Sequence, residues 1–190
     1  MVQDQAHLQE TLVVVFDAAM QVCSAVENRL VGTSAALLRG VNLPVGDVDF
    51  LVKTRNGVDA FSQALSSFDC LEAPEYLPHD RQYYANFSVN GVEVGFSTVE
   101  FETDSDAIEC VGSGPWTHFD LIPCDDYLIP TVALELRLIS ELMRNRADRY
   151  EPLLAFMQEQ GADLDLIKRG MNDGQIPQHL QSIVFEQLGY

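Results

Sequence analysis

The chain has 190 residues, which is the length of one domain or of one domain with a small helical appendage. Hydrophobic residues make up 47% of it, and this content excludes disorder along the whole length. The formal net charge of −18 argues against binding to the phosphate backbone of DNA or RNA. It fits either a solvated acidic surface or the attraction of a cationic small molecule or a basic protein.

The N-terminal residues, the apolar stretches and the cysteine spacing predict no targeting signal, membrane span or metal site. The first ten residues contain no Lys or Arg, so they do not read as a secretory signal, and no apolar stretch approaches the roughly 20 residues that span a bilayer. The cysteines form no CxxC pair and no Cys/His cluster with zinc spacing. They are Cys23, Cys70, Cys110 and Cys124. We expect a soluble, cytoplasmic protein with reduced thiols and no membrane partner.

The first part of the chain predicts helices with one strand. Apolar residues at spacings of three and four predict an amphipathic helix over residues 5–29. The segments that follow are predicted as a short helix over 35–39, a loop over 42–46, a strand over 47–52, a helix over 57–67 and, because of two prolines, a loop over 69–80.

The second part predicts a hairpin and then helices. Two strand-like runs flank Asn90-Gly91, which is a strong hairpin signal. The remaining predictions are strands over 83–89 and 92–99, an acidic loop over 102–118, and helices over 125–147, 148–160, 163–171 and 177–188. Strand signals stop near residue 125, so we divide the chain into a core, 1–125, and a C-terminal helical region, 126–190.

The segment VGTSAALLRGVNLPVGDVDF carries the clearest chemistry. Asp47 and Asp49 are two apart in a predicted strand, so their side chains point to one face. Two such carboxylates repel each other unless a cation lies between them, and a hard ion such as Mg²⁺ is the usual one. Gly32 allows a close backbone approach, and Thr33 and Ser34 offer amide and hydroxyl donors to a phosphate. This combination is what phosphoryl or nucleotidyl transfer requires.

The same segment resembles the signature of the nucleotidyltransferase superfamily, which has the DNA polymerase β-like fold. That signature is a hydrophobic residue, Gly, Gly or Ser, a spacer, and then Asp-hydrophobic-Asp/Glu-hydrophobic. Thr33 stands where Gly or Ser is usual, which keeps a hydroxyl. The resemblance implies a small stand-alone protein of the α+β class, in which helices flank a mixed β-sheet and a helical extension follows.

The resemblance also implies a third carboxylate on a later strand. Glu93 is the best match, since it follows the Asn90-Gly91 turn and faces away from Val92 and Val94. It is a departure from the family, in which Asp is commoner at this position.

The helical segments ALELRLIS and RNRADRY resemble the part of the family that lies near the nucleotide. The residues that correspond are Arg137, Arg144 and Asp148. Lys is commoner than Arg in the first of these helices.

Together these features imply an enzyme that moves a nucleoside monophosphate from an NTP to a hydroxyl, with Mg²⁺, or Mn²⁺ in its place, as the metal. The implied catalytic and metal-binding residues are Asp47, Asp49 and Glu93. The implied nucleotide-binding residues are Gly32, Thr33, Ser34, Arg137, Arg144 and Asp148. A small molecule, cationic if the net charge matters, and a protein are both open as acceptor, while nucleic acid is not expected. The 151–190 tail either caps the site or forms a homodimer.

Other readings of the same residues stay open. A catalytically inactive member of this fold would bind a nucleotide or a partner protein without turnover. A different fold would make the two aspartates incidental, in which case Gly32 would lie far from them. Arg144, Arg146 and Arg149 also fit a solvated helix end, since cations are favoured near helix C-termini.

Overall fold

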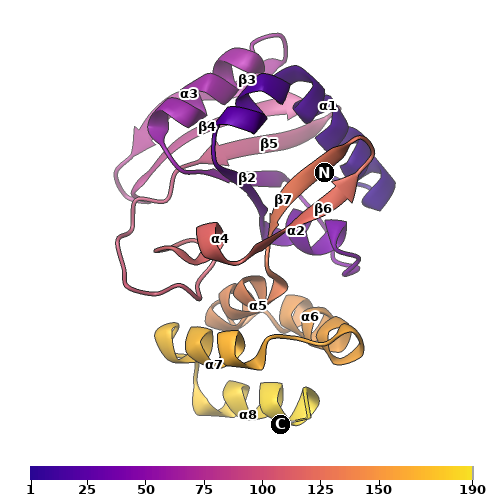
Figure 1. The fold of residues 1–190 in the computed structure, drawn as a ribbon, viewed down its shortest axis with the longest axis vertical. Helices are drawn as coiled ribbons and strands as arrows, with labels where there is room; N and C mark the ends of the chain where they lie inside the picture. The colour runs from indigo at the N-terminus through magenta and orange to yellow at the C-terminus, as the bar shows by residue number, and fades with distance from the viewer. Residues whose placement is uncertain (190) are drawn as a thin grey trace.

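The computed structural model describes residues 1–189, and it confirms the predicted α+β class. Seven strands form one mixed sheet in the order β3-β4-β5-β2-β1-β7-β6 (Figure 1). The strands are β1 (Asn28–Val31), β2 (Val48–Val52), β3 (Asp69–Leu77), β4 (Gln82–Val89), β5 (Val92–Ser97), β6 (Phe119–Cys124) and β7 (Tyr127–Val132).

The helices fall into two groups (Figure 1). The first group packs on the sheet or connects its strands: α1 (Gln5–Ala25), α2 (Gly32–Leu38), α3 (Arg55–Ala64) and the single turn α4 (Gly114–Thr117). The second group forms a separate layer at the other end of the molecule: α5 (Leu134–Met143), α6 (Ala147–Gln160), α7 (Leu164–Asp173) and α8 (Gln178–Gln187).

Two hydrophobic cores correspond to these two groups. In the first, α1 and α3 cover one face of the sheet, and the ring of Phe96 on β5 stacks on Phe50 of β2 and Phe61 of α3, at 5.3 and 4.5 Å between ring centroids. In the second, α5–α8 pack on one another and on α2 and the loop that follows it. The helix α2 therefore touches both cores and joins the sheet to the helical layer.

Local signals explain several elements. Asp4 caps α1 by accepting a hydrogen bond from the backbone N–H of His7, and Thr54 caps α3 through Gly57 in the same way. Asn90 and Gly91 both have positive φ, 53° and 73°, as a tight hairpin turn between β4 and β5 requires. The sequence prediction of this hairpin is confirmed.

Four predictions of secondary structure are wrong. The loop predicted over residues 102–118 contains the helical turn α4, Gly114–Thr117. Residues 28 and 29 belong to β1 and not to the first helix, residues 69–77 form β3 and not a loop, and residues 127–132 form β7 and not the start of a helix. β3 is the edge strand on one side of the sheet, where Pro74 is tolerated because the proline nitrogen can face away from the neighbouring strand. β6, the edge strand on the other side, contains Pro123, whereas β7, which contains Pro130, lies between β1 and β6. The sheet thus continues past residue 125.

None of the helices over residues 1–189 is both long enough and apolar enough to cross a bilayer.

Candidate active site

The junction of β1 and α2 brings Gly32 beside the two aspartates. β1 and β2 are antiparallel neighbours, and Val31 is paired with Asp49 across them. Gly32 follows at φ +71°, a conformation that glycine adopts easily, and a Cβ atom built on it would lie 3.4 Å from Oδ2 of Asp49. Gly32 therefore lies beside Asp49, and the alternative of a different fold, in which Gly32 would lie far from the aspartates, is wrong.

Asp49 lies in an environment that disfavours its charge. Its pKa is raised to about 7, first because the carboxyl is largely buried and then because of the negative charges of Asp47 and Glu109. The guanidinium groups of Arg137 and Arg144 oppose this shift in part. Within residues 1–189 Asp49 has no hydrogen-bond or ion-pair partner, which leaves its oxygens available to an external cation.

A hollow of about 390 Å³ opens in front of this pair. Its lining includes three carboxylates, the chain at Gly32 and three arginines; the carboxylates are Asp47, Asp49 and Glu109. Arg137 comes from α5, Arg144 from the C-terminal end of α5, and Arg149 from α6. Carboxylates that face cations across a cleft form a surface suited to a metal-bound polyphosphate.

A buried ion-pair network forms the back of this hollow. Arg137 is 3% exposed and pairs with Glu109 and Glu141, both of which are fully buried. Glu141 also pairs with Arg149, at 3.4 Å. Glu109 accepts a further hydrogen bond, 3.0 Å long, from the backbone N–H of Gly32. Sequence reasoning missed Glu109, Glu141 and Arg149.

The three missed residues have different explanations. Glu109 gave no local signal, because its partners Gly32 and Arg137 lie 77 and 28 residues away in the chain. Glu141 lies four residues after Arg137 on the same helix, a spacing at which opposite charges pair, and this signal was readable. Arg149 is one of three arginines that fit a solvated helix end, and the sequence does not distinguish it from the other two.

Glu93 lies on the correct face of the sheet but outside the cluster. β2 and β5 are parallel, with Val48 paired to Val94 and Asp49 to Gly95, so Glu93 shares the face of Asp49. Its side chain is exposed and borders no part of the hollow. The residue directly opposite Asp49 is Gly95, which carries no carboxylate. Over residues 1–189 no three acidic, histidine or cysteine side chains converge closely enough to hold a metal ion.

The remaining predicted residues are distributed as follows. Thr33 lines the hollow, whereas the Ser34 hydroxyl is buried and donates to the carbonyl of Val31. Arg144 lines the hollow and makes no ion pair within residues 1–189. Asp148 pairs with Arg146 on the exposed surface and is not part of the wall.

The residues present fit one divalent ion. Mg²⁺ is commonly held by one or two carboxylates, with water and substrate phosphates as its other ligands. Asp47 and Asp49 are such a pair, and the unpartnered, largely buried carboxyl of Asp49 is the observation that supports the fit. A second ion would need a third carboxylate, which a rotation of Glu93 would bring; Glu109 also borders the hollow but is paired with Arg137.

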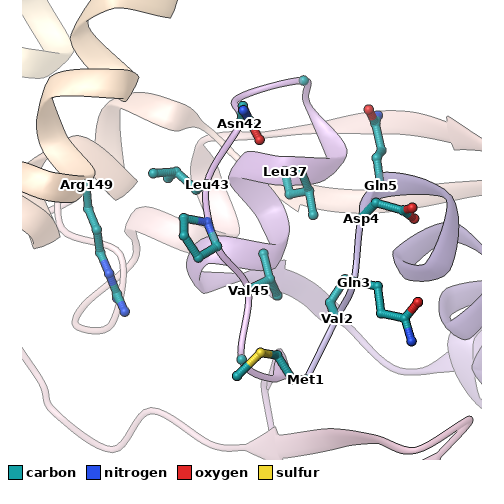
Figure 2. Close-up of a pocket in the computed structure, with 13 residues that line it drawn as sticks. Met1, Val2, Gln3, Asp4, Gln5, Leu37, Asn42, Leu43, Val45 and Arg149 are labelled. Carbon is teal, nitrogen blue, oxygen red and sulfur yellow. The ribbon is translucent and has the colours of Figure 1, made fainter.

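Two more hollows adjoin the site. One, of about 380 Å³, lies on the other side of Asp49 and is lined by Tyr84, Arg81 and Phe101 among others. The other, of about 780 Å³, lies between the N-terminal segment and the loop after α2 (Figure 2). Figure 2 shows Arg149 reaching from α6 to the rim of this third hollow. Arg149 and Gly46 border both it and the site.

The fold is that of known nucleotidyltransferase structures. TM1012 of Thermotoga maritima, a candidate nucleotidyltransferase, is similar over 84% of this chain and 96% of its own, with a TM-score of 0.61 and 16% identity. The antibiotic-resistance factor ANT(2'')-Ia is similar over 96% of this chain and 100% of its own, with a TM-score of 0.56 and 9% identity. The chain is thus a nucleotidyltransferase-fold protein, as its sequence resemblance implied.

Sequence comparison alone does not reach this result. No model of a known protein family matches the chain, and no curated protein matches it.

Proposed function

We propose that the protein transfers a nucleoside monophosphate from an NTP to a hydroxyl group of an acceptor and releases pyrophosphate. One observation carries this proposal: the unpartnered carboxyl of Asp49, beside Asp47 and Gly32, faces three arginines across a hollow. The nucleotidyltransferase fold supports it. A fold alone does not define an activity, so the argument rests on these residues.

Asp47 and Asp49 would hold Mg²⁺, which when bound neutralises charge on the triphosphate. Arg144 and Arg149 bind the phosphates, because among residues 1–189 Arg144 has no ion-pair partner and Arg149 has only a partly exposed pair. The hydroxyl of Thr33 and the backbone at Gly32 position the phosphates for in-line attack. Asp148 has no direct role in this scheme because Arg146 holds it at the surface.

The chemical step is a substitution at the α-phosphorus. The acceptor oxygen forms a bond to this phosphorus while the bond to the bridging oxygen of pyrophosphate breaks. Glu93 acts as the general base and accepts the proton of the acceptor hydroxyl. Its side chain lies on the same face of the sheet as Asp49, and because it is exposed it can rotate toward Asp49. The same rotation would make Glu93 the third carboxylate of the site.

The acceptor would lie in the hollow on the far side of Asp49, beside Tyr84 and Phe101. A small molecule fits its volume of about 380 Å³ better than an extended polymer. The net charge of −18 favours a cationic acceptor and disfavours nucleic acid. One of the similar structures named above is an antibiotic-resistance factor, which supports testing small molecules before proteins.

The first experiment is calorimetric titration with ATP, CTP, GTP and UTP, with and without Mg²⁺. It compares wild type with Asp49→Asn and with Asp126→Asn, a matched control in the exposed turn between β6 and β7. We expect Mg²⁺-dependent binding in wild type and the control, and its loss in Asp49→Asn. Equal binding by a well-folded Asp49→Asn protein would contradict the proposed site.

The second experiment follows pyrophosphate release with a panel of hydroxylated small molecules. Transfer should require Asp49, and Glu93→Gln should lower its rate by roughly 100-fold, as the loss of a general base does. A rate within about two-fold of wild type would remove Glu93 from the mechanism.

A second candidate function is nucleotide binding without turnover. The observation that favours it is Gly95, which stands opposite Asp49, so that over residues 1–189 the sheet has no third carboxylate converging on the aspartates. This candidate predicts Mg²⁺-dependent nucleotide binding that Asp49→Asn abolishes, together with no pyrophosphate release for any acceptor. In that case Glu93→Gln would leave nucleotide affinity unchanged.

A further inference from the structure

The loop between β5 and α4 places an acidic side chain inside the proposed phosphate site. Figure 1 shows this loop leaving the sheet and running toward the helical layer. Glu109 in this loop is fully buried, and each of its two carboxylate oxygens has a partner. Oε1 accepts from the backbone N–H of Gly32 at 3.0 Å, and Oε2 accepts from Nη1 of Arg137.

Both of these donors border the proposed nucleotide site. Gly32 and Arg137 both line the hollow that contains Asp47 and Asp49. A carboxylate and a phosphate present similar pairs of oxygens to an amide and a guanidinium, so one can replace the other at the same donors. Glu109 therefore occupies the positions that two phosphate oxygens would take.

The charge balance of the site also fits a carboxylate that takes the place of a phosphate. Glu109 and Glu141 together balance two positive charges among Arg137, Arg144 and Arg149. With the two aspartates added, the free site is no longer cationic, and a polyphosphate would meet little net attraction. If Glu109 left the site, Arg137 would keep only one acidic partner, Glu141, and the arginine wall would attract anions.

Glu109 has a short route out. The next residue, Cys110, is exposed and borders the hollows on both sides of Asp49. The contacts that hold the loop nearby include partly exposed ion pairs between Asp106 and the side chains of Arg169 and His118, and such pairs contribute little stability. A further contact is the hydrogen bond that the buried hydroxyl of Ser105 donates to Asp173, at 2.5 Å. Ala107 lies in the hydrophobic core of the sheet, and Ile108 packs, partly buried, against the core of the helical layer.

We propose that Glu109 is an internal inhibitor: it fills the phosphate subsite of the free protein and is displaced when the polyphosphate of a nucleotide binds. This inference rests on the proposed nucleotide site, whose regulation it describes. The side chain competes with the ligand for the N–H of Gly32 and for Arg137, so the affinity that is measured for wild type includes the free energy of expelling Glu109.

The test is titration of wild type, Glu109→Gln and Glu102→Gln with inorganic pyrophosphate in the absence of divalent ions. Gln keeps the size of the side chain and can still accept from the N–H of Gly32, but it no longer neutralises Arg137. We expect Glu109→Gln to bind pyrophosphate at least ten-fold more tightly than wild type. Glu102→Gln, an exposed change in the same loop, should bind as wild type does.

A second measurement uses wild type alone, so it does not depend on the folding of a variant. Pyrophosphate at saturating concentration should increase hydrogen exchange in residues 108–112, because Glu109 leaves the interior, and decrease it in residues 31–35. Protection of both segments would overturn the inference, and so would equal pyrophosphate affinity of a folded Glu109→Gln protein.

These outcomes separate the inference from the proposed function. Tighter pyrophosphate binding by Glu109→Gln without any nucleotidyl transfer would support the inhibitor and count against the enzyme. Nucleotidyl transfer with no gain in affinity in Glu109→Gln would support the enzyme and reject the inhibitor. Failure of both folded proteins to bind pyrophosphate would reject the phosphate site that both proposals share.

Discussion

The carboxyl of Asp49 lies between two acidic neighbours, Asp47 and Glu109, in a largely buried position. Such a group is unfavourable to the folded chain when it is ionised, and it is retained here where a cation would relieve the repulsion. The stability of the metal-free protein should therefore carry a signature of this one residue.

The first prediction concerns pH. The pKa of Asp49 is about 7 in the folded chain against an ordinary value of 3.8, so the folded state holds a proton that the unfolded state has lost between these values. The contribution of Asp49 to stability is thus most favourable below pH 4 and declines as the pH rises toward 7. With a chelator present, the free energy of unfolding of wild type should fall over this pH range by on the order of a few kcal/mol more than that of Asp49→Asn.

Urea unfolding of both proteins at several pH values measures this difference. Mg²⁺ added at pH 7.5 should restore stability to wild type and not to Asp49→Asn. A difference between the two proteins that stays constant from pH 4 to pH 7 would show that Asp49 titrates normally.

The second prediction concerns Arg137. Its guanidinium lies between two fully buried glutamates, so Arg137→Met would leave both without their main partner. We expect a loss of about 3–5 kcal/mol in the free energy of unfolding at neutral pH. Arg146→Met is the matched control, because Arg146 pairs with Asp148 on the exposed surface and its loss should not be measurable. Similar losses in the two variants, measured by chemical unfolding, would argue against a buried network.

At the scale of elements, the β1–α2 junction depends on the backbone of Gly32. The third prediction compares Gly32→Ala with Gly91→Ala, since both glycines have positive φ, 71° and 73°. The strain of the left-handed conformation should cost each variant about 1–2 kcal/mol of stability. A Cβ at Gly32 would also lie 3.4 Å from Oδ2 of Asp49, whereas one at Gly91 would meet nothing within 4 Å.

Only Gly32→Ala should therefore weaken Mg²⁺-dependent nucleotide binding, by at least about ten-fold, because the added methyl group narrows the space beside Asp49. Thermal unfolding and calorimetry on the same samples separate the two effects. Equal nucleotide affinities in the two alanine variants would remove Gly32 from the binding site.

The elements that sequence predicted well are those with local signals. The hairpin at Asn90-Gly91 and the helices α6, α7 and α8 were predicted within a few residues, since turn chemistry and apolar spacing determine them locally. β3 and β6 were missed because both are edge strands, where exposed side chains and prolines leave no regular alternation. Tertiary pairing, and not local propensity, defines these strands.

The residues of the candidate site also divide into those that have a local sequence signal and those that do not. Gly32, Asp47 and Asp49 lie in one short segment with a recognisable spacing, and the structure brings Gly32 and Asp49 together. Glu109 has no such signal, because its role depends on where a distant loop folds. Alternation along the strand predicts which face of the sheet carries Glu93, but it does not predict whether the side chain reaches the aspartates.

For the whole molecule, the site is formed where the sheet meets the helical layer. The sheet supplies the aspartates and the helical layer supplies Arg137, Arg144 and Arg149, with α2 in contact with both cores. Three of the eleven basic residues of the chain thus line one hollow, in a molecule whose net charge is −18. On the proposed scheme, these arginines provide local positive charge for an anionic nucleotide.

The fourth prediction follows from that net charge. An acidic surface raises the local concentration of a cationic acceptor, and salt screens this attraction because the Debye length is only about 10 Å at 0.1 M ionic strength. For a polycationic acceptor, raising NaCl from 50 to 500 mM should increase KM by roughly ten-fold and leave kcat unchanged. A neutral polyhydroxylated acceptor should show a change below about two-fold, because it does not respond to the field. Steady-state kinetics with the two acceptors distinguishes the cases. Parallel salt dependence for both would mean that salt acts on the nucleotide site, where Arg144 and Arg149 meet the phosphates, and that the acidic surface does not select the acceptor.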